Sequence, residues 1–358
     1  MNNQPQTTNN QQPTTNYQFE FRPYQRKFKR PLSTNHGIWD IREGIILRLT
    51  DETGRFSWGE IAPISWFGSE TLEQAWDFCQ QLPPKITAET IFSIPATLPA
   101  CQFGFESAWG MGNGEWGMGM VGFPLGIRGN GETITAFTPY SLLPTPLSPL
   151  PFSYLLPAGK AALQSWQTLW NQGNRTFKWK IGVASIEEEL KVFDELLQAL
   201  PESVQLRLDA NGGLTQQEAK QWLRVADAAG MVEFLEQPLP LEQFDAMLEM
   251  SRQHSTPIAL DESVATLNQL EDCYQRGWRG IFVIKVAIAG YPSRLRQFCQ
   301  VHEIDAVFSS VFESAIAKRA ALQLAAQLSN PNRAIGFGVN HWFNEDDETW
   351  LKQLWKDY

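Results

Sequence analysis

The feature that most constrains the fold is a regular alternation of short β-rich runs with helical segments beyond Pro151. Eight such runs fit the strands of a closed (β/α)8 barrel of the TIM type. A doubly wound open sheet alternates in the same way, but the chain has no GxGxxG motif after an opening strand and no GxxxxGKS/T motif. We therefore predict a barrel with strands at 152–156, 175–181, 204–208, 232–235, 258–260, 281–284, 306–308 and 334–336, and helices that include 186–199, 215–229 and 314–328.

The size and charge of the chain limit its domain content and its possible partners. Its 358 residues, 43% of them hydrophobic, suffice for one large barrel with an accessory domain. The net charge of −10 and the pI near 5.0 argue against a nucleic-acid partner, because neutralising phosphates needs a concentrated basic surface.

Membrane segments and disulfides are not expected. No run of 18 apolar residues occurs, and the N-terminus lacks the basic-then-apolar pattern of a signal peptide. The four cysteines are widely separated and show no CxxC spacing, so neither a zinc site nor a disulfide framework is indicated. We expect a protein of the cytoplasm.

The first part of the chain has a different organisation. Residues 1–16 contain no large apolar side chain besides Met1, so we expect a disordered tail. Alternating strands and a helix that begins near Ser69 indicate an α+β domain, and the Gly-, Met- and Trp-rich stretch 109–131 indicates a long loop or a loosely structured hairpin arm. The predicted domain limits are 1–16, 17–145 for the α+β domain, 146–335 for the barrel and 336–358 for a C-terminal segment.

Two lysines share one face of the strand expected at 175–181. Lys178 and Lys180 alternate with Phe177, Trp179 and Ile181, which indicates an interior strand rather than a solvent-facing one. Two ammonium groups this close disfavour each other's charge. The pair is therefore expected to lower the pKa of at least one lysine and to suit it for proton abstraction near neutral pH.

Three carboxylates stand at the ends of three successive predicted strands: Asp209, Glu236 and Asp261. Active-site groups of such barrels lie at the carboxyl ends of the strands, and neighbouring strands are about 4.8 Å apart, so the three side chains can converge on one cation. Oxygen-only ligands favour Mg²⁺ or Mn²⁺ over Zn²⁺. Each acid taken singly could be a helix cap, but three in succession predict a metal site.

A further lysine, Lys285, closes the apolar run at 281–284. It would face the predicted metal site from the side opposite Lys180. A lysine that extends to the surface is the ordinary alternative.

The order of these residues on successive strands resembles the enolase superfamily, and within it the muconate-lactonizing-like subgroup. The resemblance covers nearly the whole chain from Tyr17. It implies a modified (β/α)8 barrel with an N-terminal α+β capping domain, to which the segment 336–358 returns. The motifs that carry it are KWK at 178–180, DAN at 209–211, EQP at 236–238, DES at 261–263 and Lys285.

Flanking motifs resemble the o-succinylbenzoate synthase family: IWDIREG at 38–44, WGEIAP at 58–63, FGSETL at 67–72 and SSVFES at 309–314. Dipeptide epimerases of the subgroup carry a DxD element on the eighth strand, where this chain reads GFGVNH at 336–341. Sugar-acid dehydratases use a histidine base on a late strand, and none of the four histidines here ends a strand in that position.

The resemblance implies a metal-dependent syn-elimination of water from 2-succinyl-6-hydroxy-2,4-cyclohexadiene-1-carboxylate, which gives 2-succinylbenzoate for menaquinone or phylloquinone biosynthesis. Lys180 would remove the α-proton and protonate the departing hydroxyl, Lys285 would stabilise the intermediate, and Lys178 would tune Lys180. Asn211 and Glu262 are expected to orient the metal ligands. The predicted substrate contacts are Arg207, Ser309 and Ser310.

Other functions remain open at this point. An N-succinylamino acid racemase would also use opposed lysines on two strands. A non-catalytic binding protein on a barrel scaffold is disfavoured because every expected acid and lysine is present, and a sugar-binding module that uses the 14 tryptophans would not explain inward carboxylates. The expected partner is a small-molecule carboxylate substrate, and the sequence makes no prediction of the oligomeric state.

Overall fold

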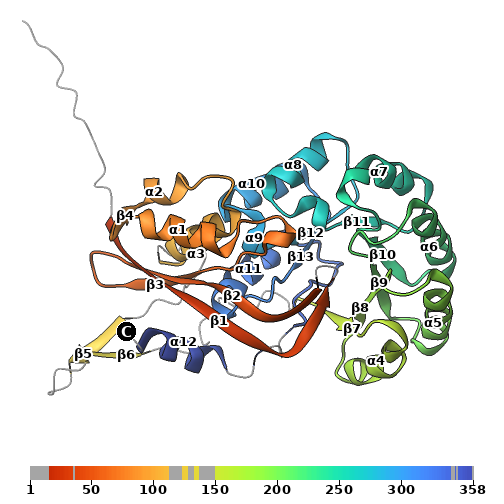
Figure 1. Ribbon diagram of the computed structural model, residues 1–358, viewed down its shortest axis with the longest axis horizontal. Helices are drawn as coiled ribbons and strands as arrows, with labels where there is room; N and C mark the ends of the chain where they lie inside the picture. Colours follow the sequence, from red (N-terminus) through yellow and green to blue (C-terminus); the bar gives the residue numbers. More distant parts are fainter. Residues whose placement is uncertain are drawn as a thin grey trace, which may run out of the picture.

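The computed structural model describes residues 16–34, 37–112, 123–127, 133–136, 150–339, 343 and 346–356. Their strands form a four-stranded antiparallel sheet, a seven-stranded parallel sheet and a two-stranded hairpin. The four-stranded sheet and the parallel sheet lie on opposite sides of the molecule (Figure 1). The predicted tail lies outside the described residues except for Asn16, which begins the first strand.

The parallel sheet contains seven of the eight predicted barrel strands in sequence order. Adjacent strands run parallel in every pair. The strands are β7 (Ser153–Leu156), β8 (Thr176–Lys180), β9 (Gln205–Asp209), β10 (Val232–Glu236), β11 (Ile258–Leu260), β12 (Ile281–Lys285) and β13 (Ala306–Ser309).

The eighth predicted strand consists of two isolated bridges that close the barrel. Ile335 bridges Phe152 beside β7, and Gly336 bridges Ser309 of β13, both in the parallel sense. The N–H of Ser153 donates to the carbonyl of Ile335 (2.9 Å), and the N–H of Gly336 donates to the carbonyl of Phe308 (2.7 Å). These bonds pair both edges of the seven-stranded sheet. The predicted modified (β/α)8 barrel is therefore confirmed, with a very short last strand.

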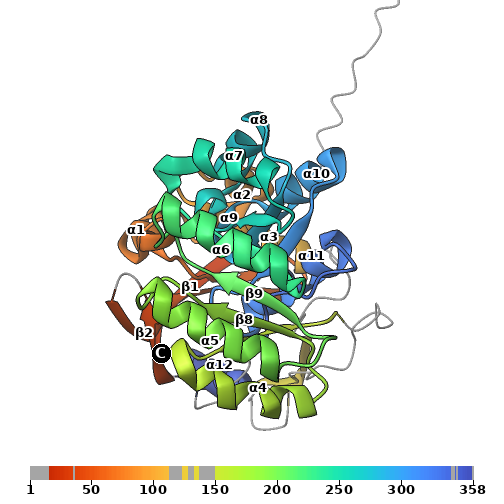
Figure 2. The ribbon, with the colours of Figure 1, turned by 90° about the vertical axis from the view of Figure 1, so that its right-hand side faces the viewer.

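Helices cover the outside of the barrel, and Figure 2 shows α4, α5 and α6 in front of β8 and β9. The helices predicted at 186–199, 215–229 and 314–328 are confirmed, and their N-terminal caps are Ser185, Thr215 and Ser314. The α-helices of the barrel are α4 (Ala162–Asn171), α5 (Ile186–Ala199), α6 (Gln216–Ala229), α7 (Phe244–Gln253), α8 (Leu267–Gln275), α9 (Val286–Ala289), α10 (Pro292–His302) and α11 (Ala315–Leu328). The 3-10 helices are η2 (Gly159–Ala161), η3 (Leu241–Gln243) and η4 (Glu262–Val264).

Side chains alternate between the barrel interior and the helix layer as the strand period requires. One separate buried cluster fills the interior and contains Phe234, Ala259, Ile281, Val283 and Val307. Their strand neighbours, such as Phe282 and Ile284, belong to the main core shared with the helices. Lys178 and Lys180 are half-buried, while Phe177, Trp179 and Ile181 are fully buried in that outer core, so the predicted division of faces is confirmed.

The four-stranded sheet and the three helices beside it form the cap, residues 16–112 without 35 and 36. The helix predicted to begin near Ser69 is α1, whose N-cap Thr71 forms a capping box with Gln74. The cap contains β1 (Asn16–Thr34), β2 (Gly37–Thr50), β3 (Phe56–Ile61), β4 (Lys85–Thr87), η1 (Ser65–Phe67), α1 (Leu72–Gln81), α2 (Ala88–Phe92) and α3 (Pro99–Gly112).

The stretch 109–131 is only partly the predicted loop or hairpin. Its first residues belong to α3, which continues to Gly112, so the prediction of irregular structure is wrong there. Its later part contains β5 (Phe123–Ile127), which pairs antiparallel with β6 (Thr133–Ala136). The remaining residues of this stretch lie outside the described part of the chain.

The C-terminal helix α12 (Asp347–Lys356) packs against the cap rather than the barrel strands (Figure 1). Trp350 and Leu351 form a buried cluster with Tyr24, Ile46 and Trp58. The predicted domain limits stay a prediction, since residue 145 is not among the described residues. No helix within the described ranges combines the length and apolar character that crossing a membrane requires.

Candidate active site

Charged residues stand at the carboxyl ends of five neighbouring strands of the barrel, β8 to β12. Lys180, Asp209, Glu236 and Lys285 are the last residues of β8, β9, β10 and β12, and Asp261 directly follows β11. The strand register pairs Lys180 with Asp209 and Asp209 with Glu236. The structure therefore brings the predicted lysines and acids together at the carboxyl end of one barrel.

Two of the three lysines bind the acids directly. The Nζ atom of Lys178 lies 2.8 Å from Asp209 Oδ2 and 2.5 Å from Glu236 Oε1. Lys285 Nζ binds the carboxylate of Asp261. Among the described residues, no carboxylate lies within ion-pair distance of Lys180, so no acid competes there for its Nζ atom.

The pKa of Lys178 is shifted in the direction opposite to our expectation. Its burial acts to lower the pKa, but the negative charges of Asp209, Glu236 and Asp261 outweigh burial and raise it. The predicted lowering by the neighbouring lysine is therefore wrong for Lys178. The charges nearest to Lys178 are carboxylates from the next strands. The sequence pattern of a single strand does not reveal them.

The acids carry a surplus of buried negative charge. Burial raises the pKa of Glu236 to about 8, Asp209 adds to this rise, and Lys178 opposes it. Burial also raises the pKa of Asp261, against the effect of Lys285. Two of the three lysines bind these carboxylates, and the pKa of Glu236 and of Asp261 nevertheless stays raised, so the bound ammonium groups do not fully compensate the buried charge. A divalent cation would compensate the surplus, and an all-oxygen donor set suits Mg²⁺ or Mn²⁺.

The carboxylates do not form a ready coordination sphere as they stand. Within the described ranges, no three Asp, Glu, His or Cys side chains are arranged to hold a metal ion. The reason is that Lys178 lies between Asp209 and Glu236, while Lys285 binds Asp261, so the oxygens point at ammonium groups. The donor set fits a metal once these carboxylates turn away from the lysines.

Two residues predicted to orient the ligands bind each other. Asn211 Nδ2 donates to Glu262 Oε1 (2.9 Å), and the N–H of Asn211 donates to Asp209 Oδ1 (3.2 Å). Burial raises the pKa of Glu262, against the effect of Lys285. The pair links the second residue after Asp209 with the residue after Asp261.

Sequence reasoning missed Gln237, which fixes the position of Asp261. Its fully buried side chain accepts hydrogen bonds at Oε1 from the N–H groups of Asp261 (3.0 Å) and Ser263 (3.2 Å). Its Nε2 donates to Ser263 Oγ (2.8 Å). The sequence does contain a signal for this role, because Gln237 is a polar residue between Glu236 and a proline, immediately after a buried strand.

The predicted substrate contacts Ser309 and Ser310 have different environments. Ser309 ends β13 in register with Lys285, on the inner face of the barrel. Its Oγ lies so close to Gly336 that a Cβ there would be 2.6 Å away, so any larger residue at 336 would force Ser309 to shift. Ser310 is buried and donates to Glu313 Oε2 (2.8 Å). Ser310 thus takes part in a bond within its loop, and its substrate contact stays a prediction.

Arg207 is also not placed as a substrate contact. Its Nε donates to Glu233 Oε2 (2.6 Å) and its Nη2 donates to the carbonyl of Ala334 (2.7 Å). Glu233 in turn binds Arg333, which binds Asp305. This buried network lies toward the amino ends of the strands, and Phe234 packs against the guanidinium. The predicted substrate contact of Arg207 is therefore corrected, because its guanidinium already donates its hydrogen bonds to acceptors of the protein.

Replacing Arg207 by methionine is expected to destabilise the barrel and leave substrate binding unchanged. Breaking a buried ion pair costs about 3 kcal/mol, because a charge is left without its partner. Urea unfolding measures this loss. The control Arg276→Met removes an exposed pair with Asp245 and is expected to cost less than about 1 kcal/mol. A raised KM at unchanged stability would restore Arg207 as a substrate contact.

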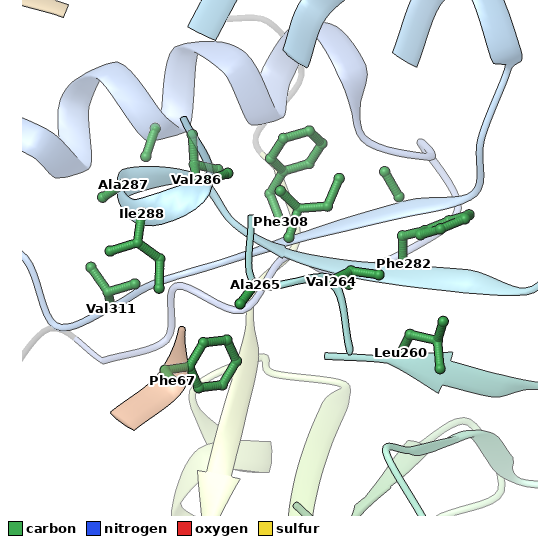
Figure 3. Packing of buried hydrophobic residues seen from close by; sticks show 14 of the residues in the cluster. Phe67, Leu260, Val264, Ala265, Phe282, Val286, Ala287, Ile288, Phe308 and Val311 are labelled. Carbon is green, nitrogen blue, oxygen red and sulfur yellow. The ribbon is translucent and has the colours of Figure 1, made fainter. Parts of the chain in front are cut away.

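The cap contributes directly to the site. The ring of Phe67, in η1, lies with its centroid 3.9 Å from Lys285 Nζ. Figure 3 shows Phe67 with Ala265 and Val311 in the main apolar cluster. A cation over an aromatic face is attracted by the ring, so the cap helps to hold the ammonium group of Lys285.

Backbone strain accompanies the strand ends. Three of the four non-glycine residues with positive φ in the described ranges follow barrel strands: Asn211 (φ 43°), Gln237 (φ 37°) and Phe312 (φ 60°). Asparagine tolerates this conformation, whereas a bulky side chain such as that of Phe312 seldom adopts it. Such strain costs about 1–3 kcal/mol per residue and persists only where surrounding contacts enforce it.

Two family models match different parts of the chain. A family model described as "Enolase C-terminal domain-like" matches residues 161–353, which include all the lysines and acids of the site. A second model, described as "MenC, N-terminal domain", matches residues 25–110 of the cap.

Individual relatives cover nearly the full chain. An o-succinylbenzoate synthase from Thermosynechococcus vestitus is 40% identical over 327 residues, 90% of this chain and 92% of that protein. An L-Ala-D/L-Glu epimerase from Bacillus subtilis is 26% identical over 87% of this chain and 84% of that protein. A crystal structure of o-succinylbenzoate synthase from Thermosynechococcus elongatus, complexed with Mg in the active site, matches with a TM-score of 0.80 and 38% identity, over 95% of this chain and all of that chain.

Proposed function

The chain belongs to the enolase superfamily and, within it, to the o-succinylbenzoate synthase family, and we propose that its site eliminates water from 2-succinyl-6-hydroxy-2,4-cyclohexadiene-1-carboxylate to give 2-succinylbenzoate. The observation that carries this proposal is the group of three acids and three lysines at the carboxyl ends of β8 to β12. The product serves menaquinone biosynthesis, or phylloquinone biosynthesis where that quinone is made. The MenC-type cap supports this pathway.

Asp209, Glu236 and Asp261 are the residues that hold the metal. Mg²⁺ is the proposed ion because it is bound in the active site of the similar synthase, and the same oxygen donors suit Mn²⁺. When bound, the cation attracts the substrate carboxylate and offsets the negative charge that develops on it. Asn211 and Glu262 keep the ligands oriented through their mutual hydrogen bond.

Lys180 is the proposed base and acid. Its Nζ takes the proton next to the substrate carboxylate and then gives a proton to the departing hydroxyl on the same face. The freedom of Lys180 from carboxylate partners among the described residues supports this role. Lys178, bound by two acids, keeps its positive charge and assists carboxylate binding.

Lys285 stands across the barrel from Lys180, because β9, β10 and β11 separate β12 from β8. Its positive charge stabilises the electron-rich intermediate. Ser309, beside Lys285, and the adjacent Ser310 are the candidates for substrate contacts. The partner of the site is thus a small-molecule carboxylate. The four free, buried cysteines agree with a reducing cytoplasm as its location.

A second activity, racemisation of N-succinylamino acids, is favoured by one observation. Lysines on opposite sides of a barrel can remove a proton from one face of a carbon and return one to the other face. An epimerase is among the relatives, although the region after Gly336 lacks the DxD element of dipeptide epimerases.

Side-by-side assays with Mg²⁺ test both activities. Purified protein is expected to convert the cyclohexadiene substrate to an aromatic product, followed by its ultraviolet spectrum. Exchange of the α-proton of N-succinylamino acids in D₂O is measured in parallel. Absence of dehydration by a folded, Mg²⁺-loaded protein would exclude the synthase activity. Exchange without dehydration would favour the racemase.

A further inference from the structure

The loop that follows β13 is held by its own hydrogen bonds. The carboxylate of Glu313 accepts from Ser310 Oγ (2.8 Å) and from the N–H of Val311 (2.6 Å) at Oε2. The N–H of Phe312 donates to Ser310 Oγ (2.9 Å). The loop follows Ser309, which ends β13 beside Lys285, so the loop borders the site on this side.

Aromatic residues of the cap enclose the strained residue of this loop. The ring of Phe312, whose φ is 60°, meets Phe28 edge-on at 5.7 Å and Trp39 edge-on at 5.6 Å between centroids. Phe28 and Trp39 also contact each other at 5.2 Å. Edge-to-face pairs of this kind are favourable, so the cap compensates a backbone conformation that phenylalanine otherwise avoids.

The same cap rings continue to the active-site lysine. Trp39 contacts Trp66 edge-on at 5.7 Å, and Trp66 contacts Phe67 at 6.1 Å. Phe67 lies over Lys285. One set of aromatic contacts thus reaches both the loop after β13 and the lysine at the end of β12.

The far end of the loop is also fixed by the cap. Glu60 of β3 is fully buried, and its carboxylate accepts from the N–H of Ser314 (3.0 Å), from Ser314 Oγ and from the N–H of Ala317 (3.2 Å). These donors belong to the N-cap and the first turn of α11. The carboxylate therefore anchors the helix start that follows the loop, while Phe312 contacts the cap in the middle of the loop.

We infer that Phe312 is a positioning residue through which the cap holds the loop after β13 in place, where it continues from Ser309 and borders the site beside Lys285. The residue acts through the loop and does not move the proton itself. This inference rests on the proposed dehydration, because it is tested through the KM for the substrate of that reaction. The role is recognised by substitutions that change the thermal stability of the protein and its affinity for the substrate to different extents.

Steady-state kinetics and thermal unfolding of the full chain with Mg²⁺ test this role. Phe312→Leu and Phe312→Gly are expected to raise KM about tenfold, because the loop loses its ring contacts with the cap, while kcat changes little. Glycine adopts positive φ without strain, so Phe312→Gly should unfold at a temperature no lower than Phe312→Leu despite losing more apolar surface. Phe312→Tyr retains the ring and should restore a wild-type KM.

The cap side of the contact is tested by Phe28→Leu. This variant should raise KM in the same way, and the double variant with Phe312→Leu should raise it no further, since both remove one contact. The matched control is Phe92→Leu, an exposed cap aromatic on α2, whose KM should equal that of wild type.

Three outcomes decide whether Phe312 has this positioning role. KM values within twofold of wild type in folded Phe312→Leu, Phe312→Gly and Phe28→Leu overturn the inference, whatever their unfolding temperatures. If no Phe312 variant folds, the KM of Phe28→Leu decides alone. A wild-type protein without dehydration activity refutes the proposed function instead, which separates the two failures.

Discussion

Lys180→Ala is expected to lower turnover by roughly four orders of magnitude, the upper range for loss of a positioned acid or base. The reason is that Lys180 ends β8 within the group of acids and, among the described residues, is bound by none of them. Its removal takes away the proposed proton acceptor without breaking an ion pair. Turnover of the cyclohexadiene carboxylate, followed in the ultraviolet, measures the effect.

The fold and the metal site should survive this change. The unfolding temperature and its rise with Mg²⁺ are expected to match wild type, because Lys180 is not a proposed ligand. Lys191→Ala, on the exposed face of α5, is the matched control and should keep full turnover. A Lys180→Ala protein with substantial activity would exclude Lys180 as the base.

Glu236→Gln is expected to remove the stabilisation by Mg²⁺ and to lower turnover by about a thousandfold. The amide keeps the shape of the side chain but withdraws one of three negative charges from the site. A bound cation contributes several kcal/mol to stabilising developing charge, and about 4 kcal/mol corresponds to this factor. Thermal unfolding across a Mg²⁺ titration measures binding separately from turnover.

An exposed glutamate provides the control for this substitution. Glu242→Gln in η3 makes the same chemical change at the surface and should leave both measurements unaltered. If Glu236→Gln retains the full Mg²⁺-dependent rise in unfolding temperature, Glu236 is not a ligand. The surplus of buried negative charge would then need another explanation.

Much of the site could be predicted because strand alternation is a local property. Lys178 and Lys180 share a face by their spacing alone, and Asp209, Glu236 and Asp261 each end a run of buried residues. The order of parallel strands then brings them to one end of the barrel. No contact between distant residues had to be known.

The errors arose where a partner lies far away in the sequence. Arg207 occupies an inward position, as predicted, but Glu233 and the carbonyl of Ala334 take up its donors. The register between β9 and β10 shifts at Glu233, which simple alternation does not anticipate. The pKa of Lys178 has the opposite sign for the same reason, since its neighbours come from other strands.

The contacts that the cap makes could not be predicted from sequence patterns either. The segment with Trp39 and the segment with Phe312 were each recognised by resemblance, yet nothing in either predicts that their rings meet. The positive φ of Phe312 also has no signal in its sequence, because glycine or asparagine would be the expected residue there.

The two bridges that complete the barrel have a consequence for how the chain is made. Until Ile335 and Gly336 leave the ribosome, β7 and β13 each present an open edge with unpaired backbone groups. Such edges invite pairing with other chains. The nascent protein therefore passes through a stage with an incomplete sheet, and a chain that stops between β13 and Ile335 would expose both edges and aggregate readily.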